Sequence, residues 1–217
     1  MPRIDAASDR ALLVTFADEM DEAAARAVHA LAADLAASPV PGQVDVHPAY
    51  ASILVTFDPL AADPVLLEDE LSLRVARACE APDARRRTVV VPVRYGGPEG
   101  PDLAEVARAT GLSPAEVVRL HASAAYEVVF LGFTPGFPYL TGLPPALFTR
   151  RRDQPRRRVE AGSVAIAGTQ AGIYPVASPG GWNVLGRTDL VLFDPARDPL
   201  VLLGPGDLVR FVPADAR

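Results

Sequence analysis

The chain has 217 residues, which fits one large or two small domains, and its 49% apolar and 22% charged residues indicate a folded core. A net charge of −6 argues against nucleic-acid binding, which usually needs a basic excess. No apolar run reaches the ~18–20 residues that span a bilayer, and the first residues lack the apolar segment of a signal peptide. With Cys79 as the single cysteine, we expect a cytoplasmic protein that binds neither membrane nor nucleic acid.

The absence of lysine restricts the chemistry further, because all 21 residues counted as Lys or Arg are arginine. This excludes a Schiff-base lysine, the lysine of a phosphate loop or a protein kinase, and a biotinylated lysine. The three histidines have no metal-ligand spacing, and the sequence contains neither a Gly-x-Ser-x-Gly nor a Gly-x-Gly-x-x-Gly motif. We therefore expect no metal ion, and no cofactor held by this chain alone.

Residues 1–87 show the order strand, helix, strand, strand, helix, and a further apolar run follows at 88–93. Both helices have an apolar residue every three or four positions, and Asp63-Pro64 provides a cap and a first-turn proline for the second. If the run at 88–93 belongs to the first domain, this order predicts a ferredoxin-like α/β fold. Alternatively, the run opens the second domain. The expected strands are 10–16, 44–50 and 52–57, and the apolar positions of the helices are Ala24, Val28, Leu31, Leu35, Leu67, Leu71, Val75 and Ala78.

Residues 88–217 are predicted to form a second domain, a closed and mainly antiparallel β-barrel preceded by two short helices. The helices are expected to begin at the capping boxes of Asp102 and Ser113, each followed three residues later by glutamate. Apolar runs then alternate with Gly and Pro turns, as is typical of such a barrel. The expected barrel runs are 126–131, 163–167, 172–176, 182–185, 190–193, 200–203 and 208–212.

The segment from 132 to 188 holds nine of the 16 glycines and seven of the 22 prolines, so its backbone is rich in fixed turns. Polar side chains placed among such turns are the expected wall of a preorganised pocket, although tight barrel corners have the same composition. Successive glycine N–H groups can bind an anion, and an arginine can add a bidentate contact. The candidate site residues are Arg156, Gln170, Tyr174, Ser178, Gly180, Gly181, Asn183 and Arg187.

Several motifs in this segment resemble the allophanate hydrolase subunit 1 family. They are Gly132-Phe-x-Pro-Gly-Phe-x-Tyr-Leu, Ala161-Gly-Ser-Val-Ala-Ile-Ala-Gly-x-Gln, Gly172-Ile-Tyr-Pro, Ser178-Pro-Gly-Gly-Trp and Gly186-Arg-Thr. That family includes the B subunits of bacterial ATP-dependent 5-oxoprolinases and the Kip inhibitor of a sporulation kinase, and it is similar to half of a carboxyltransferase domain. The sequence departs from the family pattern at Arg150, Glu160 and Asp189, where proline is common.

The resemblance implies an N-terminal α/β domain, a C-terminal cyclophilin-like barrel, and a subunit of an enzyme that opens 5-oxoproline to L-glutamate with ATP as co-substrate of the complex. Arg156, Arg187 and the turn at 178–181 would hold a carboxylate or phosphate, while Gln170 and Tyr174 would orient the amide. The expected partners are a second carboxyltransferase-like subunit with a related barrel and, in addition, a third subunit. Two alternatives are a urea-related carboxyltransferase or allophanate-hydrolysing subunit, and an inhibitor of a sensor histidine kinase.

Overall fold

The protein is described by a computed structural model of residues 2–19, 21–80 and 87–214. The chain forms two compact units, Met1–Arg85 and Arg86–Arg217. This boundary lies two residues before the one predicted from the sequence. None of the helices in the described ranges has the length and apolar character needed to cross a membrane.

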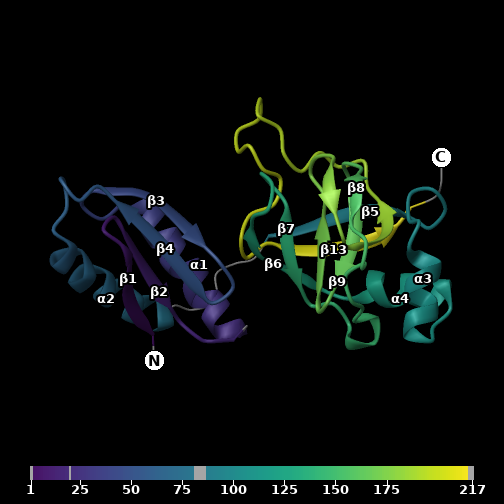
Figure 1. Cartoon of the computed structure of the whole chain (residues 1–217), viewed down its shortest axis with the longest axis horizontal. Helices are drawn as coiled ribbons and strands as arrows, with labels where there is room; N and C mark the ends of the chain where they lie inside the picture. The colour runs from purple at the N-terminus through teal and green to yellow at the C-terminus, as the bar shows by residue number, and fades with distance from the viewer. Residues whose placement is uncertain (1, 20, 81–86, 215–217) are drawn as a thin grey trace. The chain divides into compact units, whose positions relative to one another are not determined.

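The first unit is an antiparallel four-stranded sheet with two helices packed on one face (Figure 1). The strand order is β1-β2-β4-β3. Alternate residues of β2 and β4, among them Val14 and Ile53, point into a core shared with both helices, whose predicted apolar positions are all buried. The elements are β1 (Arg3–Ser8), β2 (Ala11–Thr15), α1 (Glu22–Ala37), β3 (Gln43–Pro48), β4 (Ser52–Phe57) and α2 (Pro64–Glu80).

The ferredoxin-like description of this unit is not confirmed. The apolar run at 88–93, which would have completed that fold, forms β5 (Thr88–Tyr95) in the barrel of the second unit, which is the alternative that the sequence left open. The edge position beside β2 is occupied instead by β1, which the sequence did not predict. Its residues are mostly exposed, so β1 carries no apolar alternation that could have revealed it.

The second unit is built around a closed barrel of seven strands in the order β10-β7-β6-β13-β5-β12-β9. Its pairs are antiparallel except β13 with β5, so the mainly antiparallel barrel is confirmed and fits a cyclophilin-like fold. The predicted runs at 190–193 and 200–203 form only an isolated bridge, between Phe193 and Val201. The other barrel strands are β6 (Tyr126–Leu131), β7 (Pro138–Thr141), β9 (Ser163–Ala167), β10 (Gln170–Ile173), β12 (Asn183–Arg187) and β13 (Leu208–Pro213).

A two-stranded ribbon, β8 (Arg156–Val159) paired with β11 (Ser178–Gly180), lies outside the barrel ladder. Strand β9 is buried along its whole length, because its alternate side chains enter two different apolar clusters. One cluster fills the barrel. The other is aromatic, contains Phe137, Tyr174 and Trp182, and includes Val159 of the ribbon. The ribbon therefore covers an apolar outer face of the barrel.

Two helices, α3 (Leu103–Thr110) and α4 (Pro114–Ser123), precede β6, and a short 3-10 turn, η1 (Pro145–Leu147), follows β7. The predicted capping box of α4 is confirmed: Ser113 Oγ accepts a hydrogen bond from the N–H of Glu116, and the Glu116 carboxylate accepts one from the N–H of Ser113. The predicted box at α3 is wrong. Asp102 makes no side-chain hydrogen bond to its helix, because its carboxylate has other partners.

His121 of α4 is fully buried in the barrel core. Its Nδ1 lies 2.8 Å from the hydroxyl of Tyr95, and its ring packs against Tyr126 and Phe211. The groups that face it from β5, β6 and β13 are thus aromatic rings rather than carboxylates. Burial lowers the pKa of His121 to about 3, so the imidazole is neutral in the folded protein.

This histidine predicts an acid-sensitive contribution to stability. An unfolded histidine titrates near ~6.5 and binds more protons than folded His121 below that pH, so its contribution is complete above ~6.5 and is lost as the pH falls toward 3. Between pH 7.5 and pH 5 the stability advantage of wild type over His121→Gln should shrink by about 2 kcal/mol. Chemical denaturation of both proteins at the two pH values measures this, and parallel pH dependence would contradict it.

Candidate functional site

Asp102 is only 1% exposed, and its carboxylate accepts hydrogen bonds from three separate parts of the second unit. Arg152 Nη1 donates to it at 2.6 Å, and Arg156 donates through both terminal nitrogens at 2.7 Å. The backbone N–H of Val184 donates to Asp102 Oδ2 at 2.8 Å. One buried carboxylate therefore joins the start of α3, the arginine-rich segment and β12.

This arrangement corrects the role predicted for Arg156. The sequence suggested an arginine that offers its guanidinium to a carboxylate or phosphate. In the structure its two terminal nitrogens form a bidentate pair with Asp102. Arg156 therefore holds the ribbon against α3, and its cation is already matched by a buried anion.

A small hollow, here called the Arg187 pocket, has a volume of about 140 Å³. That is a few times the ~30 Å³ of one water in the liquid and below the ~300–1,000 Å³ of pockets for drug-sized ligands, so the pocket suits a small molecule. Arg187 Nε donates to the carbonyl of Ala161 at 2.9 Å, and within the described ranges its guanidinium makes no ion pair. The pocket is lined by Pro98, Glu99, Pro101, Arg156, Arg158, Val159, Glu160, Ser163, Val184 and Arg187.

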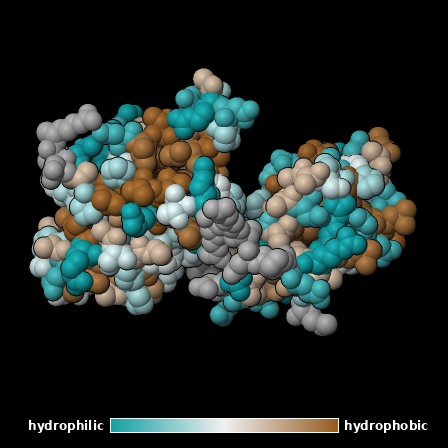
Figure 2. Space-filling model, turned by 180° about the vertical axis from the view of Figure 1, so that it is seen from behind, coloured by the Kyte–Doolittle hydropathy of each residue, from teal (hydrophilic) through white to brown (hydrophobic). Residues whose placement is uncertain are grey.

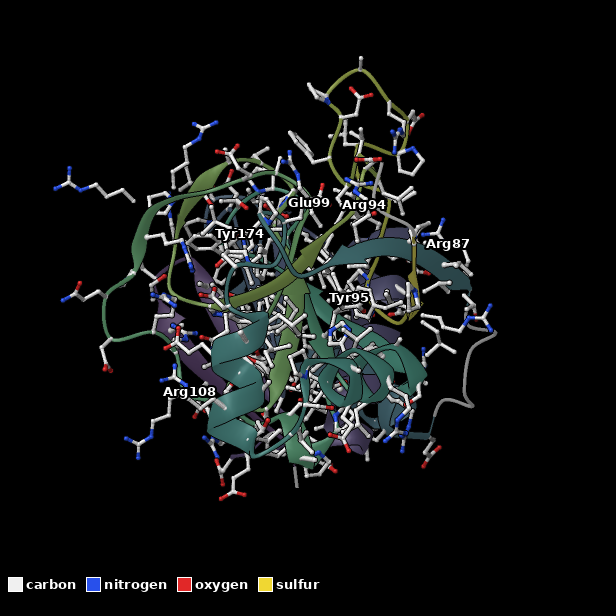
Figure 3. The ribbon with its side chains drawn as sticks, turned by 90° about the vertical axis from the view of Figure 1, so that its right-hand side faces the viewer. Arg87, Arg94, Tyr95, Glu99, Arg108 and Tyr174 are labelled. Atoms are coloured by element: carbon white, nitrogen blue, oxygen red, sulfur yellow. The ribbon has the colours of Figure 1, made fainter. Side chains whose placement is uncertain are left out.

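The acidic residues of this pocket are engaged by other arginines. Arg94 donates to both oxygens of Glu99, and Figure 3 shows the two side chains together at one end of the unit. These hydrogen bonds hold the pKa of the Glu99 carboxyl below its ordinary value. Arg158 donates to Glu160 at 2.7 Å and lowers the pKa of Glu160 in the same way. Arg187 forms no ion pair with the described residues, although its charge also contributes to the lowered pKa of Glu99 and of Glu160.

Two of the departures from the family pattern contribute to this network. Asp189 accepts two hydrogen bonds from Arg94, each at 2.8 Å, and Glu160 pairs with Arg158. The third departure, Arg150, uses its backbone carbonyl to accept a hydrogen bond from the side chain of Asn183 at 2.8 Å. At these positions charge pairing and hydrogen bonding fix the loops where proline rigidity is absent.

Tyr174 belongs to the aromatic cluster on the outer face of the barrel, and burial raises the pKa of its hydroxyl. Its backbone N–H donates to the carbonyl of Ser163, at the same end of β9 as Arg187. A side chain at Gly180 would collide with the Tyr174 hydroxyl, whereas one at Gly181 would meet no atom closer than 3.5 Å. Glycine is therefore required at 180 by close packing, and the Ser178 hydroxyl nearby is buried without a described partner.

The predicted site residues do not gather at one place. Arg187 pairs with Ser163 at the first residue of β9, whereas Gln170 pairs with Ala167 at the last, about 13 Å away at ~3.3 Å per residue. Asn183 lies at the Gln170 end, where its amide donates to the Arg150 carbonyl. The structure brings Arg187, Arg156 and the Tyr174 region to one end of β9, and leaves Gln170 and Asn183 at the other.

The chain matches known proteins along most of its length. The family model of the carboxyltransferase domain, subdomain C and D, matches residues 2–203. The 5-oxoprolinase B subunit of Bacillus subtilis strain 168 is 40% identical over 220 residues, covering 97% of this chain and 92% of the relative. The chain belongs to the family of 5-oxoprolinase B subunits. The relative of the same name from Escherichia coli O157:H7 is 50% identical over 177 residues, which cover 80% of this chain and 79% of that one.

Solved structures have a similar fold. TTHA0988 superposes with a TM-score of 0.83 and is 42% identical, and the match covers 96% of this chain but only 40% of TTHA0988. The urea carboxylase of Kluyveromyces lactis has a TM-score of 0.75 at 23% identity, with 99% of this chain and 22% of that chain covered, which shows a shared fold alone. The B-subunit resemblance is confirmed, whereas the wider grouping with allophanate hydrolase and Kip proteins stays a prediction.

Sequence reasoning missed the residues that organise the site of this B-subunit family member. Asp102 was interpreted as a helix cap, and Arg94 and Glu99 were not singled out. Val184 lies 82 positions from Asp102, and Asp189 lies 95 positions from Arg94, so local patterns carry no signal for these contacts. No group of three or more His, Cys, Asp or Glu suited to a metal ion occurs among the described residues.

Loss of the Asp102 charge should destabilise the second unit. Asp102→Asn leaves Arg152 and Arg156 facing a neutral amide in a buried site, and we expect a loss of about 2–4 kcal/mol. Glu105→Gln is the matched control, because Glu105 also pairs with Arg152 but is 54% exposed. That variant should cost less than ~1 kcal/mol. Equal unfolding free energies for the two variants in urea would contradict the role assigned to Asp102.

Proposed function

We propose that the chain is the B subunit of a cytoplasmic, hetero-oligomeric, ATP-dependent 5-oxoprolinase, which opens 5-oxoproline to L-glutamate. The observation that carries this proposal is the 40–50% identity to proteins named as B subunits of 5-oxoprolinase over most of the chain. A lactam amide resists hydrolysis at neutral pH, so coupling to ATP through a phosphorylated species is chemically reasonable.

In this function Arg187 binds the substrate carboxylate. 5-Oxoproline is a small ring that carries one carboxylate, and the Arg187 pocket, at about 140 Å³, has the scale of such a molecule. The Nε–H of Arg187 is held by the Ala161 carbonyl, which leaves the two terminal nitrogens for a bidentate contact. Fixing the carboxylate in this way orients the ring amide for attack.

The chain needs partners to complete the reaction. Its sequence has no lysine and no recognisable nucleotide loop, so phosphoryl transfer lacks its usual residues in this chain. TTHA0988 joins the equivalent of this chain to further sequence that makes up most of its length. We infer that separate subunits supply the corresponding part here, one of them with a related barrel, and that the chain alone is inactive.

The loop 132–137 and the segment 191–201 form an apolar surface suited to such a partner. Figure 2 shows an apolar area below the projecting loop between β12 and β13. A side chain at Gly136 would meet Phe193 at 2.9 Å, so the two segments are in contact, and Phe133, Val191 and Leu200 are each more than half exposed on them. A rigid, exposed aromatic side chain is a common anchor of protein interfaces.

Phe133 is held outward by its backbone. It has φ of 64°, and the Thr134 N–H donates to the Gly132 carbonyl at 2.7 Å, which is the hydrogen bond of a γ-turn. A further turn from Thr134 to Phe137 and a hydrogen bond from Gly132 to Phe137 close the loop. Such strain in a non-glycine residue persists where the surrounding structure fixes it, and it is concentrated at functional sites.

The substrate role of Arg187 is tested by Arg187→Gln in the reconstituted complex. Removal of a charge-assisted carboxylate contact should lower kcat/KM for 5-oxoproline at least tenfold while the melting temperature stays within about 2 °C. Arg158→Gln is the control, since Arg158 lines the same pocket but is paired with Glu160 and exposed. Full turnover by Arg187→Gln would eliminate Arg187 as the carboxylate contact.

The partner surface is tested by Phe133→Ser. We expect the affinity for the neighbouring subunits, measured by titration calorimetry, to fall at least tenfold because an aromatic anchor is lost. Phe148→Ser provides a comparison, because Phe148 is 43% exposed but belongs to neither segment of the surface. If both variants bound the partners as wild type does, this surface would not be the interface.

A further inference from the structure

A second hollow of the barrel unit, here called the arginine pocket, has no role in the function proposed above. It has a volume of about 450 Å³, within the range of ~300–1,000 Å³ found for small-molecule sites. Helix α3, the loop 148–153 and the start of β12 enclose it. Its lining residues are Glu105, Val106, Ala109, Phe148, Thr149, Arg150, Arg151, Arg152, Asp153 and Asn183.

The pocket has an excess of positive charge, because its lining contains three arginines, Arg150, Arg151 and Arg152, and two acidic residues, Glu105 and Asp153. Six arginines lie between positions 150 and 158. Three of them form ion pairs, whereas Arg150, Arg151 and Arg157 form none with the described part of the chain. Of these three, Arg150 and Arg151 line the pocket. The chain as a whole has a net charge of −6, whereas this hollow contains two adjacent arginines that form no ion pair with the described residues.

The loop that carries these arginines is fixed by other contacts. The side chain of Asn183 donates to the Arg150 carbonyl, and the Arg152 N–H donates to the Gly181 carbonyl at 2.8 Å. The guanidinium of Arg151 lies 5.9 Å from the centre of the Trp182 ring, a cation–π arrangement. The cations are therefore presented by an anchored backbone, and one of them is oriented by an aromatic face.

Arg152, in the wall of the same pocket, has one N–H group without a hydrogen-bond acceptor in the described part of the chain. Its Nη1 donates to Asp102 and to Glu105, but its Nε is buried and has no hydrogen-bond acceptor among the described residues. A buried donor without an acceptor is costly.

These observations select the ligand chemistry. Planar guanidinium groups bind phosphate oxygens in pairs, and in a chain without lysine the phosphate contacts fall to arginine and the backbone. We propose that the arginine pocket binds a small molecule that carries several phosphate oxygens, of the size of a nucleoside triphosphate. Its identification as the ATP of the reaction rests on the proposed function, whereas the binding itself does not.

Trp182 provides a direct readout, because it is the only tryptophan of the chain and Arg151 lies over its ring. The full-length chain is titrated with ATP, with inorganic pyrophosphate and with inorganic phosphate, and both tryptophan fluorescence and heat are recorded. We expect saturable binding of ATP and of pyrophosphate, weaker binding of phosphate, and a fluorescence change as Arg151 turns to the ligand. Absence of saturable heat with all three ligands at millimolar concentration would overturn the proposal.

Matched variants distinguish specific binding in the pocket from nonspecific attraction of anions to the arginine-rich segment. Arg150→Gln and Arg151→Gln should each weaken pyrophosphate binding about tenfold, and Arg151→Gln should also abolish the fluorescence change. Arg157→Gln removes the same charge from the same segment outside the pocket and should bind as wild type does. Equal weakening by all three variants would overturn the site. Because no turnover is involved, a failed titration leaves the 5-oxoprolinase proposal intact, and a failed turnover assay leaves the titration result intact.

Discussion

The second unit depends on one buried carboxylate. Asp102 takes four hydrogen bonds, three from the guanidiniums of Arg152 and Arg156 and one from the backbone of β12. A buried charge is tolerated when such partners satisfy it. Removal of any one partner leaves the remaining charges buried without full compensation, which destabilises the fold. The segment 150–155 has little regular structure of its own, so this carboxylate determines where Arg152 and Arg156 point.

The same carboxylate separates the two hollows of the unit. Arg156 lines the Arg187 pocket on one side, and Arg152 lines the arginine pocket on the other. Ion pairs engage Arg156 and Arg158 in the smaller hollow and Arg152 in the larger one. Arg187 in the smaller hollow, and Arg150 and Arg151 in the larger, form no ion pair with the described residues. A small carboxylate in the first and a polyphosphate in the second would give the protein two anion sites that share one structural wall.

Local sequence patterns predicted the parts of the fold that depend on local chemistry. The apolar stripes of α1 and α2 and the capping box at Ser113 were correct, because spacing and short-range hydrogen bonds determine them. Local patterns did not predict the ion pairs of Asp102, the strand β1 or the separation of the candidate site residues along β9. Asp102 fits a helix cap as well as an ion-pair hub, β1 has no apolar alternation, and the register of β9 places Gln170 and Arg187 at opposite ends.

In the proposed function, Arg187 recognises the substrate carboxylate in the assembled enzyme. The most direct measurement compares 5-oxoproline with 2-pyrrolidinone, the same lactam without the carboxylate, as substrates of complexes that contain the wild-type or the Arg187→Gln chain. Wild type should strongly prefer 5-oxoproline in kcat/KM, and Arg187→Gln should lose most of this preference. An unchanged preference in Arg187→Gln would show that Arg187 does not recognise the carboxylate.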